Sequence, residues 1–215
     1  VRLPVAVNAD SLATWFAPTV AAFAADAPVL LDVAVDDEGH TAEWLRGGGV
    51  LAAVTASARP ATGCNSRPLG AMRYIAAASP AFVRRHFAAG VDASAVARAP
   101  SLVFSNKDEL QTRWVRRLCR RHVELPRHTL PSSQAFVVAA VAGMGWGLHP
   151  QSLIADQLQQ GTLVPLLQDA PHHIQSQAAL DVPLYWQHAR ATSALLDGLS
   201  QAVLAAALAT LVQVF

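Results

Sequence analysis

A cluster of polar residues stands where the first apolar run of the chain gives way to a helical pattern. Val5 to Val7 are apolar, and Asn8, Asp10 and Ser11 follow them. Asp and Ser side chains at such a position commonly accept hydrogen bonds from the free N–H groups of a first helical turn. The same groups could instead hold a ligand, since a helix N-terminus favours an anion and a carboxylate favours a cation. The segment alone leaves both interpretations open.

Similar polar groups stand near the carboxyl ends of the other predicted strands. Ligands of α/β proteins bind at this edge of the sheet, so these side chains are expected to approach one crevice. Hydroxyl groups suit a carboxylate and acidic groups suit an amine or a guanidinium, so the mixture fits a small zwitterionic or cationic molecule. Each residue alone is also a common turn or cap former. The predicted ligand-binding residues are Asp10, Ser11, Asp36, Thr55, Phe104, Asn106, Asp108, Ser132 and Ser133.

Signatures of catalysis are missing from the sequence. There is no G-x-S-x-G, H-E-x-x-H or P-loop pattern, and the eight histidines lack the spacing of a zinc site. The GMGWG segment at 143–147 lies between a predicted helix and a predicted strand, the reverse of a dinucleotide-binding order. We interpret it as a helix end followed by close packing. No catalytic residue, metal or cofactor is expected.

One predicted helix is strongly basic. Five arginines fall at positions i, i+3, i+4, i+7 and i+8, which predicts one basic face opposite Trp114, Val115 and Leu118. Such a face could bind phosphate groups or could be a solvated outer surface. The formal net charge of +1 for the whole chain favours the solvated surface. The five are Arg113, Arg116, Arg117, Arg120 and Arg121.

Composition limits the class of protein. The 215 residues are 53% hydrophobic, and the near-neutral charge gives no general case for a nucleic-acid or membrane partner. Two cysteines, Cys64 and Cys119, favour a reducing compartment, so a cytoplasmic location is expected. The first residues, VRLPVAV, begin as a strand without signal-peptide features, although the chain could be a fragment. Polar residues such as Asp197 interrupt the apolar segment 195–215, which favours a packed helix over a membrane span.

Strand and helix signals alternate along the chain, which predicts parallel sheets with helices on both faces. Two lobes joined by short crossovers fit this pattern better than one large sheet. Pro18 either kinks the first helix or marks its true start. The predicted strands include 4–7, 29–35, 50–55, 101–104, 144–150, 163–167 and 182–187. The predicted helices are 12–23, 41–46, 109–122, 135–141, 153–160 and 193 onward.

Two segments of the chain share a short sequence pattern. Residues 8–14 and 106–112 both read N-x-D-x-L-x-T after a predicted strand. Chance or shared capping chemistry is the preferred explanation. The alternative is that two similar lobes present equivalent loops to one cleft.

Several long segments resemble the effector-binding region of LysR-type transcriptional regulators. They are LPVAVNADSLATWFAPTVAAFA, AVTASARPATGC, RPLGAMRYIAAASPAF, AGMGWGLHPQSLI and VPLYWQ. The segments NADSLATWF, GAMRYIAAASPAF and FSNKDELQ are similar to the ArgP/LysG subgroup, which controls export of arginine and lysine. The resemblance extends over nearly the whole chain, although the last turns after Leu208 are more apolar than expected for the family.

The resemblance implies a two-lobed, periplasmic-binding-protein-like fold of type II. Each lobe would be a mainly parallel sheet flanked by helices, and the chain would cross twice between the lobes. Residues 1–72 would begin lobe I, residues 73–177 would form lobe II, and residues 178–215 would return to lobe I and end in a helix. The implied effector cleft is lined by Asp10, Ser11, Thr55, Asn106, Asp108, Ser132 and Ser133.

The implied function is non-enzymatic sensing of lysine or arginine in control of amino-acid export genes. Promoter DNA would be bound only through a winged helix-turn-helix that would precede Val1. We expect the ligand carboxylate near Ser11, and a ligand cation near Asp10 first, or else Asp36 or Asp108. The resemblance also implies an antiparallel homodimer in which one lobe of each subunit meets the other lobe of its partner, with helices 12–23 and 109–122 as candidate contacts. The alternatives are a solute-binding protein of an amino-acid transporter, which would share the fold, and a small α/β enzyme.

Overall fold

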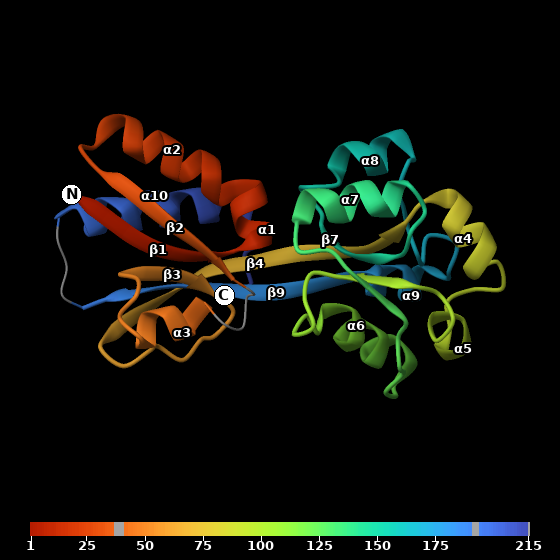
Figure 1. The fold of residues 1–215 in the computed structure, drawn as a ribbon. Helices are drawn as coiled ribbons and strands as arrows, with labels where there is room; N and C mark the ends of the chain where they lie inside the picture. Colours follow the sequence, from red (N-terminus) through yellow and green to blue (C-terminus); the bar gives the residue numbers. More distant parts are fainter. Residues whose placement is uncertain (37–40, 191–193, 215) are drawn as a thin grey trace. The chain divides into compact units, whose positions relative to one another are not determined.

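The computed structural model describes residues 1–36, 41–190 and 194–214. The chain forms two compact units, called here unit 1 (Val1–Met72 and Asp181–Phe215) and unit 2 (Arg73–Leu180). It passes from unit 1 into unit 2 within the strand β4 (Cys64–Ala78) and returns within β9 (Ala179–Ala189) (Figure 1). Helices and strands alternate in both units, so the expected α/β architecture is confirmed.

Unit 1 is built on a mixed sheet. Besides parts of β4 and β9, it contains β1 (Arg2–Asn8), α1 (Ala9–Ser11), η1 (Leu12–Phe16), α2 (Ala17–Asp26), β2 (Leu30–Asp36), α3 (Thr41–Arg46), β3 (Ala52–Thr55) and α10 (Ala194–Thr210). The strand order is β2-β1-β3-β9-β4; β1 is parallel to β2 and β3, whereas β9 is antiparallel to β3. Figure 1 shows α2 and α10 on one face of this sheet and α3 on the other. The central position of β1 explains its apolar run, because Val5 to Val7 are fully buried.

The helix after β1 is continuous from α1 through η1 to α2, with helical backbone angles at both joints. Its middle segment η1 is π-helical. Pro18 has no N–H to donate to the Thr14 carbonyl and its ring crowds that carbonyl, so a wider turn before the proline accommodates it. The helix therefore begins three residues earlier than predicted, and Pro18 does not mark its start.

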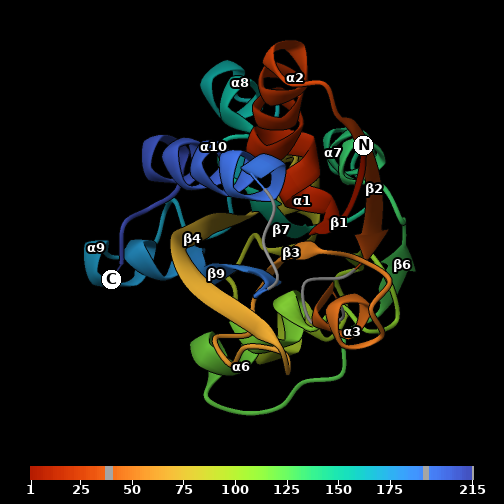
Figure 2. The ribbon, with the colours of Figure 1, turned by 90° about the vertical axis from the view of Figure 1, so that its left-hand side faces the viewer.

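The C-terminal helix α10 packs against α2 (Figure 2). Trp186 of β9 donates its indole N–H to the hydroxyl of Ser200 at 2.9 Å, inside the core. Beyond the helix, Val212 and Ala71 of β4 exchange two backbone hydrogen bonds of 2.8 and 3.0 Å, so the apolar tail after Leu208 is tied to the sheet. No helix in the described ranges combines the length and the apolar composition that crossing a bilayer requires.

Unit 2 has two groups of strands around its core. Besides parts of β4 and β9, it contains α4 (Pro80–His86), α5 (Ala93–Val96), β5 (Ser101–Val103), α6 (Leu110–Cys119), β6 (Arg127–Thr129), α7 (Ser133–Val141), β7 (Gly147–Pro150), α8 (Ala155–Gln160), β8 (Val164–Pro165), α9 (His172–Gln175) and η2 (Ser176–Ala178). β4 pairs antiparallel with β7 and β8, and β5 pairs parallel with β6. Figure 1 shows α7 and α8 on one side of β7 and α6 on the other. The buried cluster includes Ala77, Leu102, Phe136, Ile154 and Leu163.

The GMGWG segment has the structural role expected of it. Gly143 follows the end of α7 with a φ of +81°, a conformation that suits glycine after a helix. A Cβ at Gly147 would lie 2.5 Å from Cε1 of Phe136, so only glycine lets β7 approach α7 this closely.

The expected single basic face of α6 is wrong in one respect. Trp114 and Val115 are buried as predicted, but α6 ends at Cys119. Arg120 adopts a left-handed conformation with a φ of 55°, so Arg120 and Arg121 leave the line of the helix. The five arginines therefore do not share one helical face.

Candidate functional site

The carboxyl ends of three parallel strands meet at one edge of the unit 1 sheet. Asn8 pairs in register with Asp36, the last residue of β2. The pairing of Ala6 with Ala53 places Thr55, two residues further on, level with Asn8. Thr55 is fully buried, and its hydroxyl accepts a hydrogen bond from the Ser57 N–H at 3.1 Å. The side chain of Asp36 lies outside the described part of the structure, as do Asp37 and Glu38.

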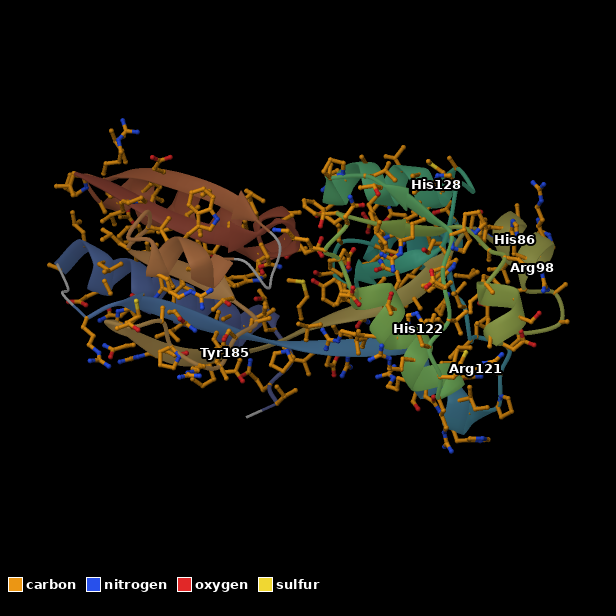
Figure 3. The ribbon with its side chains drawn as sticks, turned by 60° about the horizontal axis from the view of Figure 1, so that its bottom comes forward. His86, Arg98, Arg121, His122, His128 and Tyr185 are labelled. Atoms are coloured by element: carbon orange, nitrogen blue, oxygen red, sulfur yellow. The ribbon has the colours of Figure 1, made fainter. Side chains whose placement is uncertain are left out.

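The N-cap of the helix that leaves this edge is Asn8, and neither Asp10 nor Ser11 occupies that position. Asn8 is the N-cap residue, with extended backbone angles (φ −71°, ψ 150°), and its side chain makes no capping hydrogen bond. Asp10 lies in the first turn and is half-buried. A carboxylate in a first turn is favourable to the helix dipole without being a cap. Tyr185 of β9, which pairs with Thr55, belongs to the same sheet (Figure 3).

Two buried polar atoms on this helix have no hydrogen-bond partner among the described residues. They are Oγ of Ser11, which is 0% exposed, and Nε1 of Trp15, which is 4% exposed. The two residues are four positions apart, so both side chains leave the helix on the same side. A buried donor without a partner costs about 1–3 kcal/mol, and a ligand oxygen would remove that cost. Trp15 is not among the residues predicted from the sequence, although its spacing from Ser11 is a usable signal.

The remaining predicted ligand-binding residues lie near a second sheet edge, in unit 2. Because β5 and β6 are parallel, with Val103 opposite Thr129, the loops that follow them leave at the same edge. Asp108 accepts hydrogen bonds from the Phe104 N–H at 2.9 Å and the Leu110 N–H at 3.0 Å, one on each carboxylate oxygen. Its carboxylate therefore closes its own loop. Phe104 is half-buried, and Asn106 is exposed at the turn of the loop.

The serines after β6 begin α7. Ser132 is the N-cap residue, and its Oγ accepts a hydrogen bond from the Ala135 N–H at 3.3 Å. It is exposed, whereas Ser133 beside it is buried. The capping interpretation therefore accounts for Ser132.

Gln111, in the first turn of α6, is a further candidate that the sequence pattern does not predict. Its side chain is 1% exposed, and neither Oε1 nor Nε2 has a hydrogen-bond partner in the described ranges. Nothing in its local pattern signals this burial, because a glutamine in a first turn is usually exposed. An amide that is buried in this way offers a donor and an acceptor to a polar ligand.

The repeated N-x-D-x-L-x-T pattern does not mark equivalent positions. Asp10 lies inside its helix, whereas Asp108 precedes α6 and holds the loop before it. This difference agrees with the preferred explanation of chance or shared capping chemistry.

Burial is the main cause of the pKa shifts of His149, Cys64 and Cys119, and these shifts do not indicate a catalytic role. Burial lowers the pKa of His149 to about 4, against a smaller opposing effect of its hydrogen bond to the Ala77 backbone. The His149 ring lies edge-on to Phe136, with centroids 5.1 Å apart. Burial raises the pKa of both thiols, Cys64 and Cys119, which disfavours the reactive thiolate.

The predicted ligand-binding residues thus fall on two sheet edges. Asp10, Ser11, Asp36 and Thr55 belong to unit 1, and Phe104, Asn106, Asp108, Ser132 and Ser133 belong to unit 2. Their assembly into one site stays a prediction.

Comparison with known proteins places the chain in a family. The model of the LysR substrate binding domain matches residues 2–208. The HTH-type transcriptional regulator LysG of Mycobacterium tuberculosis is 42% identical over 206 residues, which are 96% of this chain and 64% of that protein. The chain therefore spans less than two thirds of the length of this relative.

Solved structures agree with the sequence match. ArgP from Mycobacterium tuberculosis superposes with a TM-score of 0.88 at 41% identity, covering 99% of this chain and 69% of that one. Full-length LysG from Corynebacterium glutamicum with bound effector Arg superposes with a TM-score of 0.82 at 34% identity, covering 98% and 69%. These matches confirm the expected periplasmic-binding-protein-like fold of type II. The chain therefore belongs to the LysR substrate-binding domain family, with the LysG and ArgP regulators among its relatives.

Proposed function

We propose that this chain is the effector-binding domain of a LysR-type transcriptional regulator and that its effector is arginine or lysine. The observation that carries the proposal is the pair of buried donors, Ser11 Oγ and Trp15 Nε1, at the start of the helix after β1. The bound Arg in Corynebacterium glutamicum LysG supports the choice of ligand.

The proposed pose follows from the groups at this helix start. The ligand carboxylate accepts hydrogen bonds from Ser11 Oγ, Trp15 Nε1 and the first-turn N–H groups, which carry the positive end of the helix dipole. A cationic group of the ligand meets Asp10, with Asp36 as the next choice. Asp108 is a further choice, and its two oxygens accept backbone N–H groups of its own loop.

Within unit 2, the amide of Gln111 is a further candidate contact for a polar ligand. Its Nε2 can donate to the ligand carboxylate, or its Oε1 can accept from a ligand ammonium or guanidinium group. The burial of both atoms supports a role in which a ligand replaces water.

The relatives favour the regulator over the alternatives. LysG of Mycobacterium tuberculosis is an HTH-type transcriptional regulator, and it supports neither a transporter component nor an enzyme. Contact with promoter DNA is proposed to belong to a helix-turn-helix segment outside residues 1–215. A cytoplasmic location follows from that role.

Replacing Ser11 by alanine tests the proposal. The described residues supply no partner for the buried Ser11 hydroxyl, which costs stability in the empty fold, so the Ser11→Ala variant should melt at or above the wild-type temperature. Its affinity for arginine or lysine, measured by calorimetry, should fall about tenfold, which corresponds to about 1.4 kcal/mol. Ser94→Ala, at an exposed serine of α5, is the matched control and should bind like wild type. Unchanged binding in the Ser11 variant would refute this pose, and no binding of either amino acid to wild type would refute the proposed effector.

The proposed domain also forms a homodimer in which unit 1 of each subunit meets unit 2 of its partner. Unit 1 carries five Lys and Arg residues against nine Asp and Glu, a formal charge of −4, whereas unit 2 carries eleven against six, a charge of +5. Opposite charges favour this pairing over one in which like units meet. An interface of this kind is isologous, so each contact occurs twice.

Exposed apolar side chains indicate the elements that would meet. Val138 and Val141 on α7 of unit 2 are exposed, and so are Leu30 and Val35 on β2, the outer strand of the unit 1 sheet. The exposed positions of α6 are basic instead, so α7 is a better candidate than the helix 109–122. The predicted helix 12–23 remains the candidate in unit 1, together with β2.

A further inference from the structure

A hollow of about 570 Å³ lies between the end of α6 and the segment formed by α9 and η2, entirely within unit 2. The polar residues that line it are Arg117, Arg120, His173, Ser176 and Gln177, four of which are exposed. Two aliphatic side chains complete the lining, and none of the lining residues is acidic. We propose that this hollow binds a small phosphate-bearing molecule of nucleotide size.

Hydrogen bonds to one backbone carbonyl hold the two walls of the hollow together. The Gln177 carbonyl accepts from Nε1 of Trp114 at 2.7 Å and from Nη2 of Arg117 at 2.7 Å. Arg117 also donates to the Ala179 carbonyl. Because Trp114 is fully buried, these bonds fix the segment around Gln177 to the core. Arg117 therefore helps to position the segment around Gln177, and both hydrogens of its Nη2 serve these two carbonyls.

The backbone of Arg120 brings a second cation to the same place. Its left-handed conformation ends α6 and turns the chain away from the helix, and Arg121 and His122 follow at this end (Figure 3). Within the described ranges, no carboxylate forms an ion pair with Arg120. Basic residues in a last turn also complement the helix dipole. That effect alone does not explain why His173 and Ser176, from another segment, line the same hollow.

The lining and the size of the hollow select the class of ligand. Guanidinium groups recognise phosphate oxygens through paired N–H donors, and the +5 charge of unit 2 attracts anions. Sites for small organic ligands occupy about 300–1,000 Å³, so the hollow exceeds the needs of a lone phosphate ion. Leu118 and Ile174 offer apolar surface to the organic part of the molecule.

Calorimetry at constant ionic strength tests the proposal with ATP, inorganic pyrophosphate and adenosine as probes. ATP and pyrophosphate should each bind saturably with one site per chain, and adenosine should show no saturable binding. Arg120→Gln should weaken the binding of ATP at least tenfold. Arg113→Gln changes an exposed arginine of the same helix that does not line the hollow, and it should stay within twofold of wild type.

Three results would overturn the proposal. They are the absence of saturable binding, adenosine binding as strong as that of ATP, and an equal loss in both variants, which would show only general attraction to a basic surface. Melting temperatures of the two variants confirm that both fold. Arginine affinity should be the same in Arg120→Gln and wild type, since Arg120 is outside the predicted effector residues.

Discussion

The polar residues that follow the strands fall into two groups according to their hydrogen bonds. Asp108 and Ser132 accept hydrogen bonds from backbone N–H groups of their own turns, so local structure accounts for them. Ser11 and Gln111 are buried, and the described residues supply no partner for their polar side-chain atoms. A residue of the second group has no role in the empty fold that explains its polarity. These are therefore the stronger candidates for ligand contact.

Asp10 offers a test that separates ligand binding from helix stability. The N-cap residue is Asn8, so Asp10→Asn removes a charge from the first turn without removing the cap. We expect the melting temperature to change little, because a first-turn charge contributes about 0.3–1 kcal/mol. The affinity for arginine and lysine should fall tenfold or more, since a charge-assisted hydrogen bond contributes roughly 1.5–3 kcal/mol. Calorimetry that finds equal affinities in the variant and wild type would remove Asp10 from the site.

His149 makes the stability of the fold depend on pH. Its pKa in the folded chain is about 4, below the ordinary 6.5, because the ring is buried. The unfolded chain therefore binds a proton at a higher pH than the folded chain. The full stabilisation is present above pH 6.5 and is lost as the pH falls toward 4, with a decrease of about 2 to 3 kcal/mol between pH 7.5 and 4.5.

The measurement is chemical denaturation of wild type and His149→Gln at those two pH values. Carboxylates titrate alike in both proteins. The difference between the losses of unfolding free energy in wild type and in the variant is therefore due to His149. The variant should lose less unfolding free energy on acidification. Equal decreases would mean that the ring is not held neutral by burial.

At the scale of elements, the helix after β1 and the helix α7 each depart from what local sequence rules predict. Pro18 is tolerated inside a continuous helix because η1 widens just before it, and η1 contains Trp15. α7 buries Phe136 and Val137 in the unit 2 core, yet it leaves valines exposed on its other side. An apolar outer side of this kind suits contact with a second copy of the chain.

Charge placed on α7 should separate the proposed dimer. Val138 is 69% exposed, so Val138→Glu should leave the fold intact while burying an uncompensated charge in the interface. Light scattering at tens of micromolar should give a dimer mass for wild type and a monomer mass for the variant. Leu208→Glu, at a leucine of α10 that is 68% exposed, is the matched control and should stay dimeric. A dimer in both variants would exclude α7 from the interface.

At the scale of the whole molecule, the net charge of +1 is the sum of two units with opposite net charges. The acidic residues lie mostly in unit 1 and the basic residues mostly in unit 2. The overall charge therefore argues neither for nor against an anionic partner of one unit. The basic unit can attract phosphate groups without reading a nucleotide sequence.

Residues 1–215 alone should not retain a promoter specifically. Fluorescence anisotropy with the promoter fragment and with a shuffled sequence should give similar, weak binding. Both should be lost at moderate salt, because phosphate contacts release counterions. A preference for the promoter that survives moderate salt would show that this chain itself reads DNA.

The sequence by itself determined the alternation of elements and the family. Apolar runs and helix-end signals predicted β1, β2, α3 and α7 to within a few residues, since both are local properties of the sequence. The predicted strand ends bearing Thr55 and Asp108 do lie at sheet edges, because parallel strands bring their carboxyl ends together. The LysR family is indicated by contiguous segments such as NADSLATWF, whose residue order alone carries the resemblance.

Only the tertiary structure decided what each polar residue does. The local patterns of Asp10 and Asp108 look alike, but one lies inside a helix and the other closes a loop. Trp15 and Gln111 are buried, and the described residues supply no partner for their polar atoms, yet the sequence prediction included neither residue. The hollow beside Arg120 likewise requires residues 173–177 to fold back onto α6. Local sequence encodes helix and strand propensity, whereas partners and burial arise from contacts between residues that are far apart in the chain.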